Sequence, residues 1–239
     1  MKQRLDQLLV DRNLCQSRSQ AENFIRLKKV AVNGKLATKP GLFVASDAKI
    51  EFDSEQKYVS RAGLKLASVA EILNLDFKHK VVLDVGSSTG GFTDYALQNG
   101  AKKVIAVDVG TNQLHPSLKG DEKIELHEKT DIRDFKTKDK IDIIVIDVSF
   151  ISLRLILPYV KENLASMNTE IIAMLKPQFE AGRDQVNKGI IKNEKTRRQI
   201  LKDFEIWTKD YFIIKNKRDS SVSGAKGNNE RFYILTRTK

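Results

Sequence analysis

The stretch that most constrains the fold is VVLDVGSSTGGFTDY, which spans residues 81–95. Its apolar opening run, with Asp84 set near the end, predicts a buried strand. A glycine-rich turn occupies residues 86–91, and an amphipathic helix begins at Phe92. Strand, glycine turn and helix form the first crossover of a doubly wound α/β sheet. Because such sheets bind ligands at the carboxyl ends of their strands, we expect a ligand site at this turn.

The ligand expected at this turn is a cation. The glycines are not spaced as G-x-G-x-x-G, and the turn lacks the Lys-Ser/Thr ending of a phosphate loop, so neither a dinucleotide nor ATP is favoured. Asp84 suits a cationic ligand, and S-adenosylmethionine carries both a sulfonium and an ammonium group. A plain α/β turn with a partly exposed acid is the alternative.

Two further acids extend the predicted cofactor site. Asp108 ends a strand predicted over residues 103–107, where an acid can accept hydrogen bonds from both hydroxyls of a ribose. Asp131 follows a weaker strand, at a place where an acid could bind an adenine amino group. The predicted cofactor residues are Asp84, Gly86, Ser87, Ser88, Gly90, Gly91, Phe92, Asp108, Val109, Asp131 and Ile132.

Charge is unevenly distributed along the 239 residues, whose formal net charge is +11. Residues 1–52 carry +5, residues 53–180 carry −2 and residues 181–239 carry +8. Two basic regions around a near-neutral middle indicate a polyanionic partner such as nucleic acid, with scattered surface lysine as the alternative.

The cysteine count and the distribution of apolar residues limit the cellular compartment that the sequence predicts. Cys15 is the only cysteine, which excludes an intramolecular disulfide, and no run approaches the ~20 apolar residues of a membrane span. We therefore expect a reducing, cytoplasmic location and no membrane partner. The three histidines are scattered without metal-ligand spacing, and no metal is predicted.

The first fifty residues predict a small, separate module. The expected elements are a helix over residues 4–12, a capping box of Ser17 with Gln20 that starts a helix running to about Lys28, a strand at Val30–Val32, a type I′ turn at Asn33-Gly34 and a closing strand over residues 48–52. Residues 53–57 are polar and read as a linker, so the predicted domains are 1–57 and 58–239.

Strands and helices alternate through most of the remaining chain, which predicts one α/β domain. The later strands are expected at residues 124–127, 141–146, 170–175, 211–215 and 231–236, with helices at 153–164 and 195–207 and a polar loop over 216–229. Asp147 and Lys176 follow neighbouring strands and should be close in space. Lys65 and Glu230 complete a set of candidate site residues, but the pattern alone does not place them. Rim salt bridges are the alternative for all four.

Specific motifs carry a resemblance to known families. RLDQLLV and SRSQAENFIRLKKVAVNGK resemble the αL RNA-binding module first seen in a small-subunit ribosomal protein. VSRAGLKL, LDVGSSTGGFTD, VDVG, DIRDF, IDVSFISL, LKPQFE and GAKGNNERFYIL resemble the TlyA-type hemolysin and ribosomal RNA methyltransferase family, which is related to the FtsJ ribose 2′-O-methyltransferases.

The resemblance implies a fold and an activity. The expected fold is a Rossmann-like seven-stranded methyltransferase sheet whose last strand is antiparallel, with a small α+β RNA-binding module at its N-terminal side. The expected reaction is S-adenosylmethionine-dependent 2′-O-methylation of cytidine in ribosomal RNA, with ribosomal RNA or ribosomal subunits as partners. The RNA-binding residues expected in the module are Arg4, Arg18, Lys28 and Lys29.

The resemblance also implies a catalytic tetrad of Lys65, Asp147, Lys176 and Glu230. A ribose hydroxyl is a poor nucleophile, so proton removal and placement in line with the sulfonium methyl are both needed. Lys176 is the preferred base and Asp147 orients it, while the other two residues hold the ribose and the lysine pair. Two alternatives stay open at this point: a membrane-active hemolysin, and a ribosome-binding factor without catalytic activity.

Overall fold

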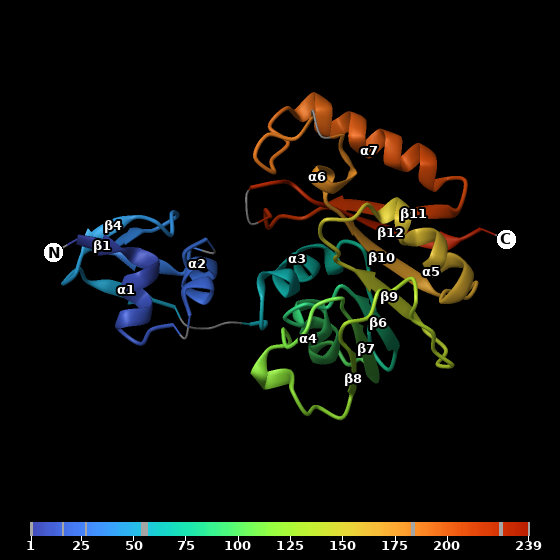
Figure 1. Cartoon of the computed structure of the whole chain (residues 1–239), viewed down its shortest axis with the longest axis horizontal. Coiled ribbons are helices and arrows are strands. Elements are labelled where there is room, and N and C mark those ends of the chain that lie inside the picture. Colours follow the sequence, from blue (N-terminus) through green and yellow to red (C-terminus); the bar gives the residue numbers. More distant parts are fainter. Residues whose placement is uncertain are drawn as a thin grey trace. The chain divides into compact units, whose positions relative to one another are not determined.

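The computed structural model describes residues 2–15, 17–26, 28–53, 57–182, 185–224 and 227–238. The chain divides into two compact units, Met1–Lys57 and Tyr58–Lys239, and each is described by itself (Figure 1).

The N-terminal unit consists of two helices and two small sheets around one apolar cluster. Its elements are β1 (Lys2–Arg4), α1 (Leu5–Asp11), α2 (Arg18–Arg26), β2 (Val30–Val32), β3 (Lys35–Leu36), β4 (Phe43–Ala45) and β5 (Ile50–Phe52). Asn33 and Gly34 have φ angles of 50° and 76°, as a type I′ turn requires, and they join β2 to β3. The amide of Gln20 donates to Ser17 Oγ at 3.2 Å, which is one half of the predicted capping box.

The C-terminal unit is built on a seven-stranded sheet with the order β11-β12-β10-β9-β6-β7-β8. Its elements are α3 (Arg61–Ala70), β6 (Val81–Val85), α4 (Gly91–Gln98), β7 (Lys103–Val107), η1 (Pro116–Leu118), β8 (Ile124–His127), β9 (Ile143–Ile146), η2 (Leu153–Leu155), α5 (Leu157–Asn163), β10 (Glu170–Leu175), α6 (Pro177–Glu180), α7 (Glu194–Thr208), β11 (Phe212–Asp219) and β12 (Arg231–Arg237). The last strand, β12, is antiparallel to both β10 and β11 and lies between them, which confirms the predicted topology.

Helices cover both faces of this sheet, so it is doubly wound (Figure 1). Alternate residues of each central strand enter opposite cores: in β6, Leu83 and Val85 pack with α5 and α7, while Val82 packs with α3 and α4. Strand β9 is buried along its whole length, because a parallel strand covered on both faces has no side that meets water.

Several sequence-based boundaries are wrong. The closing strand of the N-terminal unit, expected over residues 48–52, begins at Ile50. Strand β11 continues to Asp219, although residues 216–219 were expected to begin a loop; most of this strand is exposed, and polarity alone made it resemble a loop. The helix expected over residues 153–164 is divided into η2 and α5. The strand expected from residue 141 begins at Ile143. Residues 54–56 of the expected linker, and residues 225–226 of the expected loop, lie outside the described residues.

Helices α3 and α4 approach each other through two glycines. A Cβ on Gly63 would lie 2.9 Å from the carbonyl oxygen of Gly91, and a Cβ on Gly91 would lie 2.7 Å from Cβ of Ala62 and 2.9 Å from the amide nitrogen of Gly63. No larger side chain fits at such distances without movement of the backbone. This contact holds α3, which carries Lys65, against the end of the glycine turn.

We predict that Gly91→Ala destabilises the C-terminal unit by about 1–3 kcal/mol, because the added methyl group overpacks the contact between the helices. Helix propensity alone predicts the opposite sign, a gain of up to about 1 kcal/mol. Denaturant unfolding of the full chain measures the difference, and a variant more stable than the wild type contradicts the packing argument.

Candidate active site

Hydrogen bonds beyond the strand ends bring three predicted site residues side by side. The amide of Gly86 donates to the carbonyl oxygen of Val107 at 2.9 Å, and the amide of Asp147 donates to that of Val85 at 3.0 Å. Pairing of β6 with β7 and β9 therefore continues one residue past the strands. Gly86, Asp108 and Asp147 consequently share one edge of the sheet.

The antiparallel strand β12 adds Glu230 to this edge. In the register of β12 with β10, Leu175 pairs with Arg231, so the next pair along the two strands is Lys176 and Glu230. Lys176 Nζ lies 2.6 Å from Asp147 Oδ1 and donates to Ser149 Oγ at 2.8 Å. Lys65 Nζ, from α3, lies 2.5 Å from Glu230 Oε2. The four residues of the predicted tetrad thus form two lysine–carboxylate ion pairs.

Both pairs are nearly buried. The exposed fractions of the side chains are 10% for Lys65, 3% for Glu230, 10% for Lys176 and 14% for Asp147. Within the described residues, neither contacting carboxylate oxygen makes an aligned hydrogen bond, so each contact is an ion pair by distance alone.

Three adjoining cavities connect the ion pairs to the glycine turn. A cavity of about 310 Å³ is lined by Lys65, Lys176 and Glu230. A cavity of about 130 Å³ shares Lys176 with it and reaches Asp84 and Asp147. A third, of about 370 Å³, shares Asp147 with the second. Polar groups from strand ends far apart in the sequence therefore face one continuous region.

Most of the predicted cofactor residues line the two cavities at the turn. The larger is lined by Gly86, Ser88, Asp108, Val109, Asp131 and Ile132, and the smaller by Asp84, Gly86, Ser87, Ser88 and Phe92. Gly90 and Gly91 are placed differently: a Cβ on Gly90 would meet Leu118, and Gly91 packs against α3. These two glycines serve the packing of the turn.

Asp84 is a buried acid with one oxygen unused by the protein. Thr93 Oγ1 donates to Oδ2 of Asp84 at 2.6 Å, whereas Oδ1 is buried and has no hydrogen-bond partner among the described residues. Burial raises the pKa of Asp84 to about 7. A carboxylate in this condition is stabilised by a cation that enters the adjoining cavity.

Asp108 and Asp131 are held by the protein in different ways. The amides of Ser88 and Gly110 donate to the two oxygens of Asp108 at 2.8 and 2.6 Å, which fixes the carboxylate and leaves lone pairs for two further donors. The guanidinium of Arg133 donates to both oxygens of Asp131 at 2.9 and 2.6 Å, and these hydrogen bonds lower the pKa of Asp131.

These residues fit S-adenosylmethionine. The unpaired oxygen of Asp84 suits an ammonium group, and the fixed carboxylate of Asp108 suits a ribose diol. At Gly86, with φ of 80°, a Cβ would lie 3.0 Å from the carbonyl oxygen of Asp147, so only glycine keeps the turn this close to the neighbouring strand.

Sequence reasoning missed two residues beside the ion pairs. Ser149 contacts Lys176, and Phe150 has an exposed fraction of 92% with a φ of 65°. A bulky residue in this backbone region is strained, and strain of this kind is concentrated at functional sites. The ring of Phe150 lies 5.1 Å from that of Phe179. The available signal was position, since both missed residues closely follow Asp147 at a strand end.

The predicted RNA-binding residues of the N-terminal unit are not equivalent. The guanidinium of Arg4 donates to Asp6 at 2.9 and 2.6 Å, and Arg18 donates to the same carboxylate at 3.0 Å. Asp6 is fully buried, and hydrogen bonds from Arg4 first and then Arg18 lower its pKa to about 2. Lys29 pairs with Asp53 at 2.9 Å, whereas Lys28 is exposed with a φ of 59°.

Fold and site together define a class. The sheet is doubly wound and seven-stranded, with the antiparallel strand β12 next to the edge strand β11, and its glycine turn adjoins an acid-lined cavity. This is the architecture of the S-adenosylmethionine-dependent methyltransferases. Residues 58–238 match the model of the FtsJ-like methyltransferases, and residues 3–50 match that of the S4 domain. The chain belongs to the FtsJ-like methyltransferase family, and this membership implies S-adenosylmethionine as the methyl donor.

Individual relatives are similar over much of the chain. The 23S rRNA (cytidine-2′-O)-methyltransferase TlyA of Campylobacter jejuni is 49% identical over 179 residues, 74% of this chain and 70% of that protein. Hemolysin A of Brachyspira hyodysenteriae is 39% identical over 233 residues, 95% of this chain and 97% of that protein. A solved structure from Streptococcus thermophilus, assigned provisionally as a hemolysin, has a TM-score of 0.77 at 37% identity and covers 100% of this chain and 89% of its own.

Among the residues that the structure describes, none of the helices has the length and apolar character that a membrane span requires.

We predict that S-adenosylmethionine binding near pH 7 releases protons from Asp84. The pKa of Asp84 in the free folded protein is about 7, against about 3.9 for an unperturbed aspartate, and a bound cation lowers it. By the same shift, the contribution of Asp84 to stability is fully present below about pH 4 and is lost as the pH rises through about 7.

Calorimetry of cofactor binding in buffers of different ionisation enthalpy measures this proton release. Asp84→Asn should abolish the buffer dependence and weaken binding. Asp131→Asn is the matched control, because the pKa of Asp131 is lowered and its carboxylate is already ionised near pH 7. Equal heats in all buffers for the wild type contradict the assignment to Asp84.

Proposed function

We propose that this protein transfers the methyl group of S-adenosylmethionine to the 2′-hydroxyl of a cytidine in ribosomal RNA. The observation that carries the proposal is the pair of lysine–carboxylate contacts, Lys176 with Asp147 and Lys65 with Glu230, in a cavity that adjoins the glycine turn. The 49% identity to a protein named as a 23S rRNA (cytidine-2′-O)-methyltransferase supports the substrate.

The proposed chemistry assigns a task to each residue of the tetrad. Lys176 can act as the base only once it has lost the proton of the ion pair. Its neutral Nζ then accepts the proton of the 2′-hydroxyl, and the carboxylate of Asp147 at 2.6 Å stabilises the ammonium that forms. Lys65, from α3, and Glu230, at the start of β12, hold the ribose beside Lys176. The cofactor supplies an electrophilic methyl group when bound. The protein supplies the alignment of that methyl group with the ribose oxygen.

Phe150 is suited to hold the target base. Its ring is almost wholly exposed and borders both the cavity of the ion pairs and the larger cavity at the turn. Sequence-specific RNA recognition commonly stacks unpaired bases on aromatic side chains. A cytosine on Phe150 would leave its ribose near Lys176.

The N-terminal unit is proposed to bind RNA. It matches the S4 domain, and residues 1–52 carry a net charge of +5. Arg4 and Arg18 hold their guanidinium groups against Asp6 but keep 43% and 52% of their side chains exposed, so they can present fixed donors to phosphates. Lys28 is a separate probe, because it is exposed and takes no part in that cluster.

We predict that Lys176→Ala lowers methyl transfer by ~10²-fold or more, because it removes the general base, while cofactor and RNA binding persist. Lys176→Arg should not restore activity, since a guanidinium stays protonated near neutral pH. Single-turnover transfer of labelled methyl groups to ribosomal RNA measures both variants. Lys202→Ala, which removes an exposed lysine from α7, is the matched control and should retain activity. Near-normal turnover of Lys176→Ala would contradict the assignment of Lys176 as the general base.

We predict that a chain beginning at Tyr58 binds S-adenosylmethionine as the full chain does but fails to methylate ribosomal RNA. The reason is that the cofactor cavities lie wholly within the second compact unit, whereas the proposed RNA-docking residues lie in the first. Calorimetry and methyl incorporation measure the two properties separately. Full methylation by the shortened chain would contradict this division and assign RNA docking to the basic residues 181–239 instead.

Membrane lysis is a second candidate, because several relatives carry the name hemolysin. The same purified protein tests both functions, through methyl transfer to ribosomal RNA and release of dye from liposomes. Lysis by the wild type and by Lys176→Ala alike, without methyl transfer by either, would favour the hemolysin. A ribosome-binding factor without catalysis would bind ribosomal subunits and show neither activity.

A further inference from the structure

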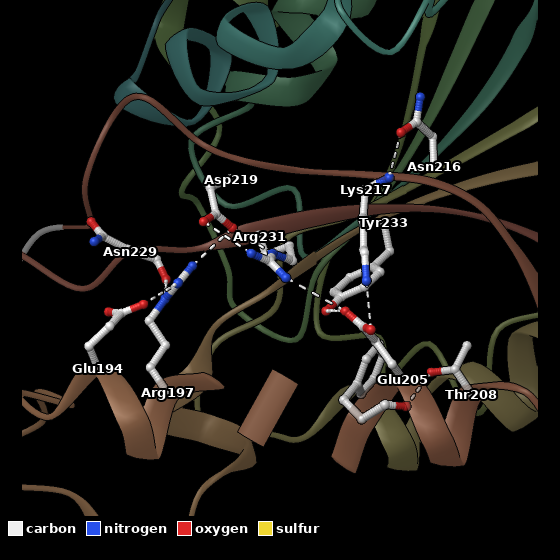
Figure 2. Close-up of polar contacts among 11 residues, drawn as sticks. Glu194, Arg197, Glu205, Thr208, Asn216, Lys217, Asp219, Asn229, Arg231 and Tyr233 are labelled. Atoms are coloured by element: carbon white, nitrogen blue, oxygen red, sulfur yellow. Dashed lines mark hydrogen bonds and ion pairs between the residues drawn. The ribbon is translucent and has the colours of Figure 1, made fainter. Parts of the chain in front are cut away.

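Figure 2 shows a charged network that joins α7 to the last two strands, β11 and β12. Two of its members, Asn229 and Arg231, flank Glu230 of the candidate active site in the sequence. Arg197 projects from α7 and is 93% buried, with a side-chain exposure of 7%. A guanidinium in such a place is costly unless each of its groups finds a partner. The partners of Arg197 are Glu194 on the same helix, Asp219 at the end of β11, and Asn229, the residue directly before Glu230.

Three contacts fix Arg197. Its Nε donates to the carbonyl oxygen of Asn229 at 3.1 Å, and its Nη1 donates to Glu194 at 3.2 Å (Figure 2). Its Nη2 lies 2.9 Å from Asp219 Oδ1 but makes no aligned hydrogen bond within the described residues, so this contact is an ion pair by distance alone. The carbonyl of Asn229 belongs to the peptide group that links Asn229 to Glu230. The orientation of that peptide group sets the direction in which the side chain of Glu230 points from the main chain.

The residue after Glu230 is held to the same network. Arg231 Nε lies 2.5 Å from Asp219 Oδ1, and Arg231 Nη2 lies 3.2 Å from Asp219 Oδ2 (Figure 2). Burial raises the pKa of Asp219, but the guanidinium groups of Arg231 and Arg197 beside it outweigh burial and lower the pKa overall. Asp219 therefore joins Arg197 to Arg231 as an ionised bridge.

The main chain of Glu230 is thus held from three directions. Arg197 binds the carbonyl before it, Arg231 follows it, and the amide of Ser220 donates to the carbonyl oxygen of Glu230 at 2.9 Å. The carboxylate of Glu230, by contrast, reaches into the cavity and pairs with Lys65. The network clamps the backbone and leaves the functional group facing the cavity.

We propose that Arg197 is a positioning residue for the Lys65–Glu230 pair, acting through the peptide group between Asn229 and Glu230. The inference rests on the proposed function, because it gives Glu230 a role in methyl transfer. Removal of Arg197 frees this peptide group to rotate and displaces the Glu230 carboxylate from Lys65. Misplacement of a group at the reacting centre by a fraction of an ångström lowers the rate of the chemical step rather than the affinity for the substrates.

The test is a double-mutant cycle with Arg197→Ala, Glu230→Gln and the two combined. Arg197→Ala should lower kcat on the order of 10- to 100-fold, with the KM for ribosomal RNA and the affinity for S-adenosylmethionine unchanged. If Arg197 acts through Glu230, the double variant should be as slow as Glu230→Gln alone. A merely structural role would multiply the two losses. Arg198→Ala removes the same charge from an exposed position of α7 and should match the wild type.

The kcat of Arg197→Lys provides a second test of the proposal. A lysine keeps the charge but cannot bind Asn229, Glu194 and Asp219 at once, so its kcat should fall between those of the wild type and Arg197→Ala. If Arg197→Ala does not fold at the assay temperature, Arg197→Lys takes its place in the cycle.

Each result decides the proposal. Unchanged kcat, losses that multiply, or a parallel loss of cofactor affinity would overturn the role of Arg197. The proposed function is judged separately, by methyl transfer in the wild type and by its loss in Glu230→Gln. An active wild type with an impaired Glu230→Gln and an unimpaired Arg197→Ala would therefore reject only this inference.

Discussion

Antiparallel pairing of β12 between β10 and β11 is the constraint on which the candidate site depends. In a wholly parallel sheet, the segment that begins a strand would lie at the edge opposite the ligand site. Because β12 runs the other way, its first residues lie at the edge where β10 ends, and Glu230 comes beside Lys176. The parallel strands β6, β7 and β9 supply the remaining groups at the same edge. One reversal of direction therefore assembles residues from both ends of the domain.

The sequence predicted the parts of this site that follow from parallel topology. Asp147 and Lys176 end neighbouring strands, and Asp84, Gly86 and Asp108 belong to the first crossover, so a pattern of strands and helices was sufficient to place them. The positions of Lys65 and Glu230 depend on other quantities. Lys65 is brought in by the close glycine contact of α3 with α4, and Glu230 by the register of an antiparallel pair, and neither has a local signal.

Three features of the fold could not be predicted from local sequence. The pairing of β1 with β4 joins strands of three residues each, which are too short to show alternation. Strand β11 lies at the edge of the sheet, and its exposed lysines made it resemble a loop. An aspartate such as Asp6 would be expected at the surface from the sequence, yet it is buried beneath Arg4 and Arg18. Two residues predicted only as RNA contacts therefore also neutralise a buried charge, so their removal should affect the fold of the N-terminal unit as well as its affinity for RNA.

The two ion pairs have a consequence for the energetics of the proposed reaction. In the reactive form, in which Lys176 is neutral, the four side chains of the tetrad carry one negative charge in total, and the bound cofactor brings the positive charge of its sulfonium. Methyl transfer turns that sulfonium into a neutral thioether while Lys176 gains a proton. Positive charge thus moves from sulfur to nitrogen within the site, and no net charge is created or lost. A reaction of this isocoulombic kind needs little rearrangement of surrounding water, so a cavity whose ionised side chains are largely buried can host it. The rate of the chemical step should be far less sensitive to ionic strength than the docking of the RNA.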